Sequence, residues 1–344
     1  MLRVGLIGAG YMMQVVHLPS LRAIGGVELV AIADLDEGLA RKVAGAFGIP
    51  KTYPSADALI AGEPGLDAVV VVTRKDHHAA ACLPALRKGI SVLIEKPLEV
   101  SIDNASEMVA TAERTGAILM IGYMKRYDPA VLELERQLGA GALGDLRYAQ
   151  LHDFGGNWTY GAPRVGAFQL GEADATPGPI RLPQPPPPDL RTTAYLEWLE
   201  VWVHDLNLAR ALFGEVRSIV FATNEVPRLV VLDCERCRVL LEMANINYPG
   251  GAWDETVTIH GSKGRGELVF PAPLLFRKPT GLTIRQSAGV FRPTLADREA
   301  FTEEMIHFLD CVRTRQQPRT PGSEGLADLR LCAAIADHAA ATAR

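Results

Sequence analysis

The start of this chain constrains its fold more than any other feature. Residues 2–7 form a short apolar run that ends at the turn Gly8-Ala9-Gly10. Apolar residues with helical spacing follow over 12–24, and a second apolar strand is predicted over 27–33. A strand, a glycine turn, a helix and a second strand make a βαβ unit, whose two strands lie parallel in one sheet.

The same alternation of strands and helices continues to about residue 122. Continuous runs of Val and Ile are typical of a parallel sheet that helices cover on both faces. We therefore predict an α/β Rossmann domain, a doubly wound parallel sheet, over residues 1–122. Its further elements are predicted as helices at 38–47, 78–88 and 102–115, and as strands at 68–72, 91–94 and 118–122.

The pattern changes after Tyr123. Several segments read as strands of a second sheet, so residues 123–344 are predicted to form an α+β domain with a predominantly antiparallel open sheet. Residues 155–193 form a long insertion with a proline-rich end, which is either a linker or a lid over a binding site. The predicted helices are 129–138, 194–213, 297–314 and 323–341, and the strands 146–154, 216–223, 228–233, 238–245, 256–261 and 266–270.

Charge and cysteine content exclude several partners. A net charge of −5 gives no basic field for the phosphates of a nucleic acid. No apolar run approaches the ~18 residues that a membrane helix needs, so no membrane partner is expected. The five cysteines are scattered and odd in number, which favours a reducing cytoplasm over a disulfide framework. Cys234 and Cys237 have no second pair, and no metal is expected.

The turn after the first strand predicts a cofactor. Its first glycine permits a tight turn, and the second lets a pyrophosphate approach the helix N-terminus, although Met13 replaces the usual third glycine. Asp34 ends the second strand, where a carboxylate can bind ribose hydroxyls, and Leu35 offers a 2′-phosphate no positive charge. NAD(H) is therefore expected over NADP(H), unless the turn and the aspartate are unrelated. The predicted site comprises Gly8, Gly10, Tyr11, Met12, Asp34 and Leu35.

Lys96 lies at the edge of the predicted sheet where ligands bind. Glu95-Lys96-Pro97 directly follows the strand 91–94, at the carboxyl ends of the strands. A residue before proline is held extended, so the lysine side chain has a defined direction. Its position alone fits a functional lysine and an exposed turn lysine equally well.

A largely apolar helix in the second half carries one polar stripe. At about 100° per residue, Glu197, Glu200, His204 and Asn207 fall within one sector of this helix. A buried polar group without a partner is costly, so the stripe is expected to face a cavity or to be hydrogen-bonded. The alternative is the solvated face of an amphipathic helix. Glu200 and His204 are four residues apart and can contact each other.

With these motifs, the chain resembles the Gfo/Idh/MocA family, which is named after glucose-fructose oxidoreductase and inositol dehydrogenase. The resemblance extends nearly from end to end. It rests on VGLIGAGYM at 4–12, VVVT at 70–73 with His78 beyond it, IEKPLEVS at 94–101, IGYMKRYDPA at 121–130, LGDLR at 143–147, HDLNLARALFG at 204–214, IHGSKG at 259–264 and a closing helix with Glu304 and Phe308.

The resemblance implies an active site between the two domains and a homodimer or homotetramer formed through the sheet of the second. It assigns catalysis to Lys96, His204 and Glu200. Arg74 stands where the family often has proline, Glu200 replaces the usual aspartate, and Asn207 stands where some members have a second aspartate. The cofactor site gains Thr73, His78, Glu95 and Lys96, and the predicted substrate contacts are Lys125, Trp158, Arg164 and Asn207.

Members of the family oxidise or reduce a secondary carbinol of a sugar or cyclitol with NAD(H) or NADP(H). The resemblance therefore implies an NAD-dependent dehydrogenase or ketoreductase, with His204 as general base and Lys96 as hydrogen-bond donor to the reacting oxygen. Two alternatives stay open. One is a non-catalytic regulator that senses the dinucleotide, and the other is a reductase of a non-sugar acceptor such as an imine or a tetrapyrrole.

Overall fold

The computed structural model describes residues 1–160, 190–246, 253–276 and 278–342. They divide into two compact units, the first of which holds residues 1–123 and 301–330. The sequence predicts residues 301–330 as part of the second domain. They join the first because Ile121 N donates to Thr320 O at 2.9 Å and Thr320 Oγ1 donates to Ile121 O at 2.7 Å. None of the described helices is long and apolar enough to cross a membrane.

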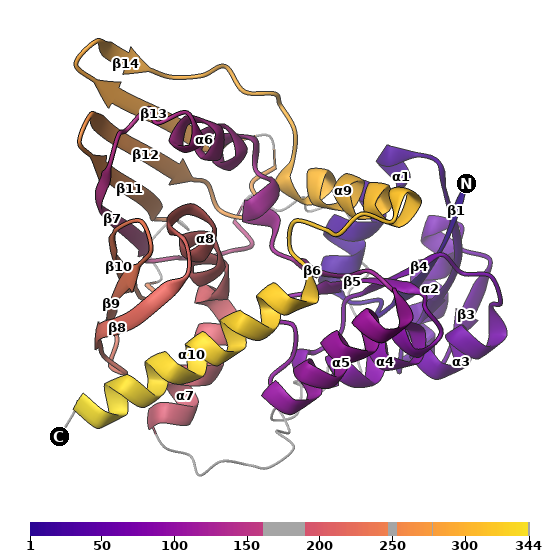
Figure 1. The fold of residues 1–344 in the computed structure, drawn as a ribbon. Coiled ribbons are helices and arrows are strands. Elements are labelled where there is room, and N and C mark those ends of the chain that lie inside the picture. Colours follow the sequence, from indigo (N-terminus) through magenta and orange to yellow (C-terminus); the bar gives the residue numbers. More distant parts are fainter. Residues whose placement is uncertain (161–189, 247–252, 277, 343–344) are drawn as a thin grey trace. The chain divides into compact units, whose positions relative to one another are not determined.

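The first unit contains the predicted doubly wound sheet (Figure 1). All its strands pair in parallel, in the order β3-β2-β1-β4-β5-β6. The order reverses between β1 and β4, and ligands of such sheets bind outside the carboxyl ends of the strands at this reversal. The strands are β1 Leu2–Ile7, β2 Val27–Ala33, β3 Lys51–Tyr53, β4 Ala68–Val71, β5 Ser91–Glu95 and β6 Leu119–Gly122.

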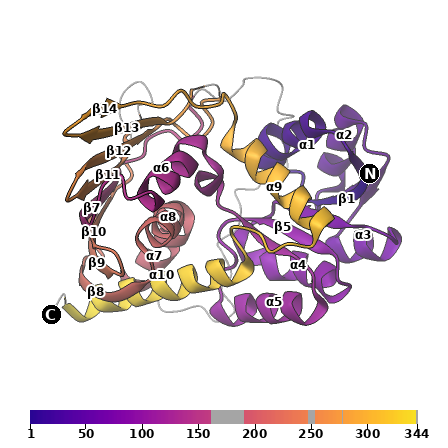
Figure 2. The same cartoon turned by 45° about the horizontal axis from the view of Figure 1, so that its top comes forward.

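Helices cover both faces of this sheet. Figure 2 shows α1, α2 and α9 on one face and α3, α4 and α5 on the other. The helix after the glycine turn includes a π turn, Met13–His17, in which Leu18 N donates to Met13 O, five residues back. The α-helices are α1 Leu18–Ile24, α2 Glu37–Phe47, α3 Ala56–Gly62, α4 His78–Arg87, α5 Ile102–Thr115 and α9 Ala300–Thr314.

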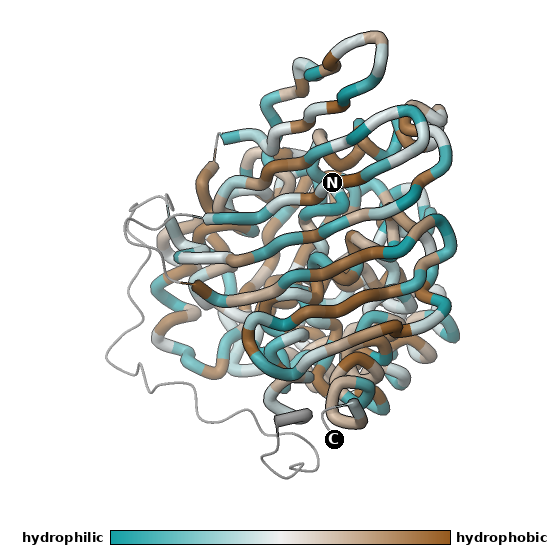
Figure 3. Tube along the Cα trace, turned by 90° about the vertical axis from the view of Figure 1, so that its left-hand side faces the viewer, coloured by the Kyte–Doolittle hydropathy of each residue, from teal (hydrophilic) through white to brown (hydrophobic). Residues whose placement is uncertain are grey.

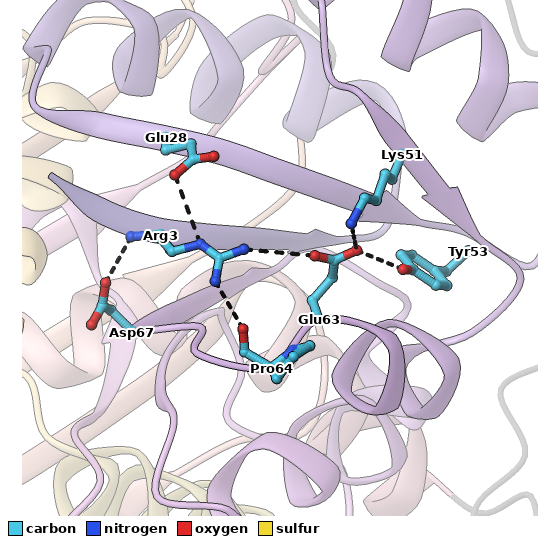
Figure 4. Close-up of polar contacts among 7 residues, drawn as sticks. All are labelled: Arg3, Glu28, Lys51, Tyr53, Glu63, Pro64 and Asp67. Atoms are coloured by element: carbon cyan, nitrogen blue, oxygen red, sulfur yellow. Dashed lines mark hydrogen bonds and ion pairs between the residues drawn. The ribbon is translucent and has the colours of Figure 1, made fainter.

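The short elements β3 and α3 were not predicted from the sequence. A buried carboxylate holds them in place: Glu63, just after α3, accepts hydrogen bonds from Lys51 Nζ at 2.7 Å and Tyr53 OH at 2.6 Å (Figure 4). The Arg3 guanidinium lies 3.8 Å from the same carboxylate, and Arg3 N donates to Asp67 at 2.7 Å. Although burial opposes it, these donors keep the pKa of Glu63 below its usual value.

The second unit is built on a sheet in the order β14-β13-β12-β11-β7-β10-β9-β8. Its strands pair antiparallel except for β7 with β10, which confirms the predominantly antiparallel sheet. Strands β13 and β14 were not predicted. The strands are β7 Leu146–Asp153, β8 Val216–Ala222, β9 Arg228–Cys234, β10 Arg238–Met243, β11 Glu255–Gly261, β12 Gly264–Phe270, β13 Gly281–Gln286 and β14 Gly289–Phe291.

Helices of the second unit pack on one face of this sheet. They include α6 Pro129–Gly139 and α8 Val203–Phe213, and Figure 3 shows the opposite face, where apolar and polar residues are interspersed. The helix predicted over 194–213 is in fact three segments: α7 Leu190–Glu197, a π turn at Trp198–Trp202, and α8. The last helix, α10 Gly322–Thr342, contributes residues to both units.

Candidate functional site

The glycine turn between β1 and the first helix has the geometry that the sequence predicted. Gly8 has φ of 94°, and a Cβ atom at this position would lie 2.0 Å from Val72 O, so only glycine fits. At Gly10, by contrast, a Cβ atom would meet nothing within 4 Å among the described residues. The turn is therefore closed towards β4 and open at Gly10, where a phosphate can approach the backbone N–H groups that begin the helix.

Asp34 is held against this turn. Its Oδ2 accepts a hydrogen bond from Ala9 N at 2.7 Å, and its Oδ1 accepts one from Asp36 N at 2.8 Å. Each carboxylate oxygen has a further lone pair, which a ribose hydroxyl can use. Leu35 is 75% exposed. Together with the half-buried Tyr11 and Met12, these residues fit the adenosine half of a dinucleotide.

Thr73 and His78 lie in the loop after β4. The His78 ring is only 1% exposed, with Nδ1 2.8 Å from Pro97 O and Nε2 3.2 Å from Thr73 O. Burial lowers the pKa of His78, although the carbonyl groups of Pro97 and Thr73 oppose this shift. In the structure, His78 therefore links the loop after β4 to the loop after β5, and Thr73 is the more accessible of the two side chains predicted to contact the cofactor.

Glu95 and Lys96 follow at the carboxyl end of β5, beside the loop of Thr73. The Glu95 carboxylate accepts a hydrogen bond from its neighbour's backbone, Lys96 N, at 3.2 Å, and lies 2.8 Å from His17 Nε2. Burial alone would raise the pKa of Glu95, but the hydrogen bond with His17 and the charge of Lys96 lower it. Glu95 is therefore an anion beside the lysine predicted to be catalytic.

Three further ionisable residues interact with Glu95 or Lys96, and none of them was predicted as a site residue. His17 contacts Glu95. Burial and the charge of Lys96 lower the pKa of Lys75 to about 8. Glu304, on α9, is 1% exposed, and its pKa is raised by burial and by Glu95. No local sequence pattern marks these residues, because they come together from separate parts of the chain. Glu304 alone had a signal in the sequence, its place in the family resemblance.

In the second unit, the predicted polar stripe is divided among different surroundings. Glu197 pairs with Arg228, whose guanidinium also lies 5.5 Å from the centre of the Trp202 ring. Glu200 is exposed and His204 is half-buried. The π turn explains the division, because it adds a residue to one turn and changes the direction of side chains before and after it. π turns of this kind are frequent at functional sites.

Asn207 is fully buried, and its Oδ1 accepts a hydrogen bond from Arg126 Nη1 at 3.0 Å. Lys125, also a predicted substrate contact, is 5% exposed. Its Nζ lies 3.0 Å from Asp205 Oδ1 and 2.6 Å from Glu255 Oε1. In the structure, both predicted substrate contacts are thus engaged by protein side chains.

The Lys125 site holds more carboxyl groups than lysines. Although burial opposes it, Asp205 and Glu255 raise the pKa of Lys125, so the lysine stays charged. Burial, together with the neighbouring acids, raises the pKa of Glu255 to about 7 and raises that of Asp153 well above its usual value. Lys125 is therefore a buried cation that interacts with carboxyl groups from β7, β11 and α8.

Two predicted residues belong to the insertion. Trp158 is 46% exposed, and Arg164 lies outside the described residues. Among the residues that the structure describes, no group of three His, Cys, Asp or Glu side chains could hold a metal ion.

Comparison with known proteins agrees with this geometry. A family described as an oxidoreductase family with an NAD-binding Rossmann fold, GFO_IDH_MocA, matches residues 2–123. The chain is 25% identical over 347 residues to an inositol 2-dehydrogenase of Rhizobium meliloti, covering 96% of this chain and 94% of the relative.

Solved structures share the fold over the full length. An oxidoreductase of Agrobacterium radiobacter in complex with NAD+, L-tartaric acid and magnesium has a TM-score of 0.76 at 19% identity, covering 98% of this chain and 96% of the other. A 3-ketoreductase of Actinomadura kijaniata in complex with NADP and TDP-benzene has a TM-score of 0.73 at 21% identity, with 98% and 97% covered. With its open glycine turn, the Rossmann domain over residues 2–123 belongs to the Gfo/Idh/MocA family of oxidoreductases, and the similarity to an inositol 2-dehydrogenase extends over nearly the whole chain.

Proposed function

We propose that the protein is an NAD(H)-dependent dehydrogenase or ketoreductase that acts on the secondary carbinol or ketone of a sugar, a sugar derivative or a cyclitol. The observation that carries the proposal is the open glycine turn at Gly10, on the same sheet edge as Lys96. The relative named inositol 2-dehydrogenase supports the substrate class.

Three side chains have separate roles in the proposed reaction. Oxidation of an alcohol removes the hydroxyl proton while a hydride leaves the carbon, and NAD+ held at the glycine turn would supply the hydride acceptor. His204 takes the proton, because histidine ordinarily titrates near neutrality, where a general base works best. Lys96 donates a hydrogen bond to the reacting oxygen and stabilises its developing negative charge. Glu200 orients the His204 ring.

The preference for NAD(H) rests on Asp34 and Leu35. A carboxylate repels a 2′-phosphate, and the exposed Leu35 supplies no positive charge to offset this repulsion. Solved relatives bind either cofactor, so the preference is a property of these two positions rather than of the family.

On the substrate side, Trp158 offers an exposed ring for stacking on a sugar. We propose that Lys125 and Asn207 act on the substrate through the groups they hold, Asp205 and Arg126. Arg164 supplies a charge for an anionic substituent. The insertion 155–193 that carries Trp158 and Arg164 is proposed as a lid or arm over the substrate.

We further propose a homodimer or homotetramer formed through the sheet of the second unit. Its strands β8, β12 and β14 carry large apolar side chains that are at least 40% exposed in the single chain, an arrangement that favours burial in an interface. These residues are Val220, Phe221, Val269, Val290 and Phe291. All five cysteines are free and buried, as expected for a protein of the reducing cytoplasm.

The proposed function is tested by initial rates with NAD+ and NADP+ across a panel of cyclitols, aldoses and uronates. The reverse reaction is tested with the corresponding ketones and NADH or NADPH. We expect turnover of a polyol or its ketone with the NAD pair, lost in Lys96→Ala and His204→Ala. Tight NAD(H) binding without turnover of any substrate would instead support a non-catalytic regulator that senses the dinucleotide. Turnover of an imine alone would support a reductase of a non-sugar acceptor.

A further inference from the structure

Three ionisable side chains from separate elements come together next to Lys96 in the first unit. His17 ends the π turn, Glu95 ends β5, and Glu304 lies on α9. His17 Nε2 is 2.8 Å from Glu95 Oε1. Burial and the charge of Glu95 raise the pKa of Glu304, so these two carboxyl groups interact. We call these three residues the His17 cluster.

The two carboxyl groups of the cluster differ in their partners. Glu95 is close to His17 and accepts from Lys96 N at 3.2 Å. Glu304 is 1% exposed, and in the described part of the chain its Oε1 is buried and has no hydrogen-bond partner. A buried carboxylate without a donor is costly, and two neighbouring buried carboxylates cannot both be charged at low cost. Glu95 is therefore the anion of the pair, and Glu304 keeps its proton.

The backbone around the cluster is built to bring these side chains together. The π turn Met13–His17 places His17, which is 2% exposed, against the end of β5. One turn further on, Ser20 Oγ lies 3.2 Å from Thr302 Oγ1, which ties the helix after the glycine turn to α9 near Glu304. Figures 1 and 2 both show α1 and α9 side by side.

We propose that His17 and Glu304 are positioning residues for Lys96: they fix the Glu95 carboxylate as a single anion in one orientation, and Glu95 holds the Lys96 ammonium group in its charged form for catalysis. The ionisable groups that interact with Glu95 are His17, Glu304, Lys96 and His78, and Lys75 interacts with Lys96. The consequence for the rate of catalysis rests on the proposed function. The effect on the charge of Lys96 does not depend on that function.

The reactivity of Lys96 towards an amine-directed acylating reagent tests this proposal without a substrate. Only the uncharged amine reacts, so the pH of half-maximal labelling, read from the Lys96 peptide by mass spectrometry, reports the charge of Lys96. In His17→Leu, Glu95 loses a hydrogen-bond partner in a buried place and gains a proton, so Lys96 loses its anionic neighbour. We expect half-maximal labelling at a pH lower by roughly one unit, which is about a tenfold larger reactive fraction at fixed pH.

Three variants provide controls in the full-length protein. His17→Gln keeps an N–H donor and should restore most of the wild-type profile. Glu304→Gln has the shape of the protonated acid and should match the wild type at neutral pH. Ser20→Ala removes the contact with Thr302 and leaves the contacts of Glu95 in place. If the charge of Glu95 controls Lys96, and the packing of α1 on α9 does not, this variant should leave the labelling of Lys96 unchanged.

An unchanged profile or a shift to higher pH in folded His17→Leu would overturn the proposal, and so would an equal shift in Ser20→Ala. Once a substrate is known, His17→Leu should lower kcat roughly tenfold to a hundredfold, the range seen when partners that orient metal ligands are removed, with the KM for the cofactor unchanged. If labelling behaves as expected but no polyol or ketone is turned over, the inference about Lys96 stands and the proposed function fails.

Discussion

Replacing Glu304 by glutamine should make the protein more stable, and increasingly so as the pH rises. Glu304 is buried with its proton in the folded protein, whereas in the unfolded chain it ionises near its ordinary pKa of 4.5. Folding above that pH must therefore return a proton to Glu304. Glutamine has nearly the same shape and never ionises, so the variant folds without this cost.

The size of the effect follows from proton linkage. Because the pKa of Glu304 is raised in the folded state, its contribution to stability is fully present below pH 4.5 and is lost as the pH rises towards the folded pKa. Each pH unit in that window costs the wild type about 1.4 kcal/mol relative to the variant. From the ordinary pKa to pH 7, the difference amounts to about 3 kcal/mol if Glu304 remains protonated throughout.

Urea unfolding of the wild type and of Glu304→Gln at pH 5, 6 and 7 measures this difference directly. Glu113→Gln, at an exposed position on α5, makes the same chemical change and should show no such slope. A free-energy difference between the wild type and Glu304→Gln that does not change with pH would refute the reasoning. It would mean that Glu304 carries the same charge in the folded and unfolded states.

Three further predictions concern the cofactor and the reaction. The double variant Asp34→Ser/Leu35→Arg should shift preference towards NADP(H), seen in the ratio of kcat/KM for the two cofactors, and wild-type affinity for NADP(H) equal to that for NAD(H) would contradict the assignment. Gly8→Ala should abolish cofactor binding in a titration of NADH fluorescence, because a Cβ atom would lie 2.0 Å from Val72 O, and undiminished binding would show that the turn is not the site. His204→Ala should lose roughly 10²–10⁴-fold in kcat with NAD(H) binding intact, and near-normal turnover would remove His204 as the base.

The fold could be predicted where apolar periodicity was strong and elements were long. The strands Leu2–Ile7 and Val27–Ala33 have the predicted bounds, because buried parallel strands are continuous apolar runs. Lys51–Tyr53 and Ala56–Gly62 were missed because they are too short to show a period. They are held instead by the buried Glu63, whose partners come from several elements.

The candidate site could be predicted only in part. Residues close in sequence, such as Gly8 and Gly10, show their geometry in the order of the chain. The contact between His17 and Glu95 joins residues 78 positions apart, and no local pattern reveals it. The π turns were missed because they change only the partner of a backbone hydrogen bond. The angles of a regular α-helix therefore placed Glu197 and Asn207 in one sector, although in the structure Glu197 pairs with Arg228 and Asn207 accepts from Arg126.

Strand β7 has a consequence for how the second sheet assembles. It comes first in the sequence of that sheet but lies inside it, parallel to β10 and antiparallel to β11. Its neighbours arrive only after some 90 further residues, as in the pairing of Met243 with Asp153, so the centre of the sheet has a high contact order and should form late and slowly. The entropy of closing such a loop grows only with the logarithm of its length, and doubling it costs about 0.6 kcal/mol. The chain between Asp153 and Leu190 can therefore gain or lose many residues with little effect on the stability or the folding rate of the sheet.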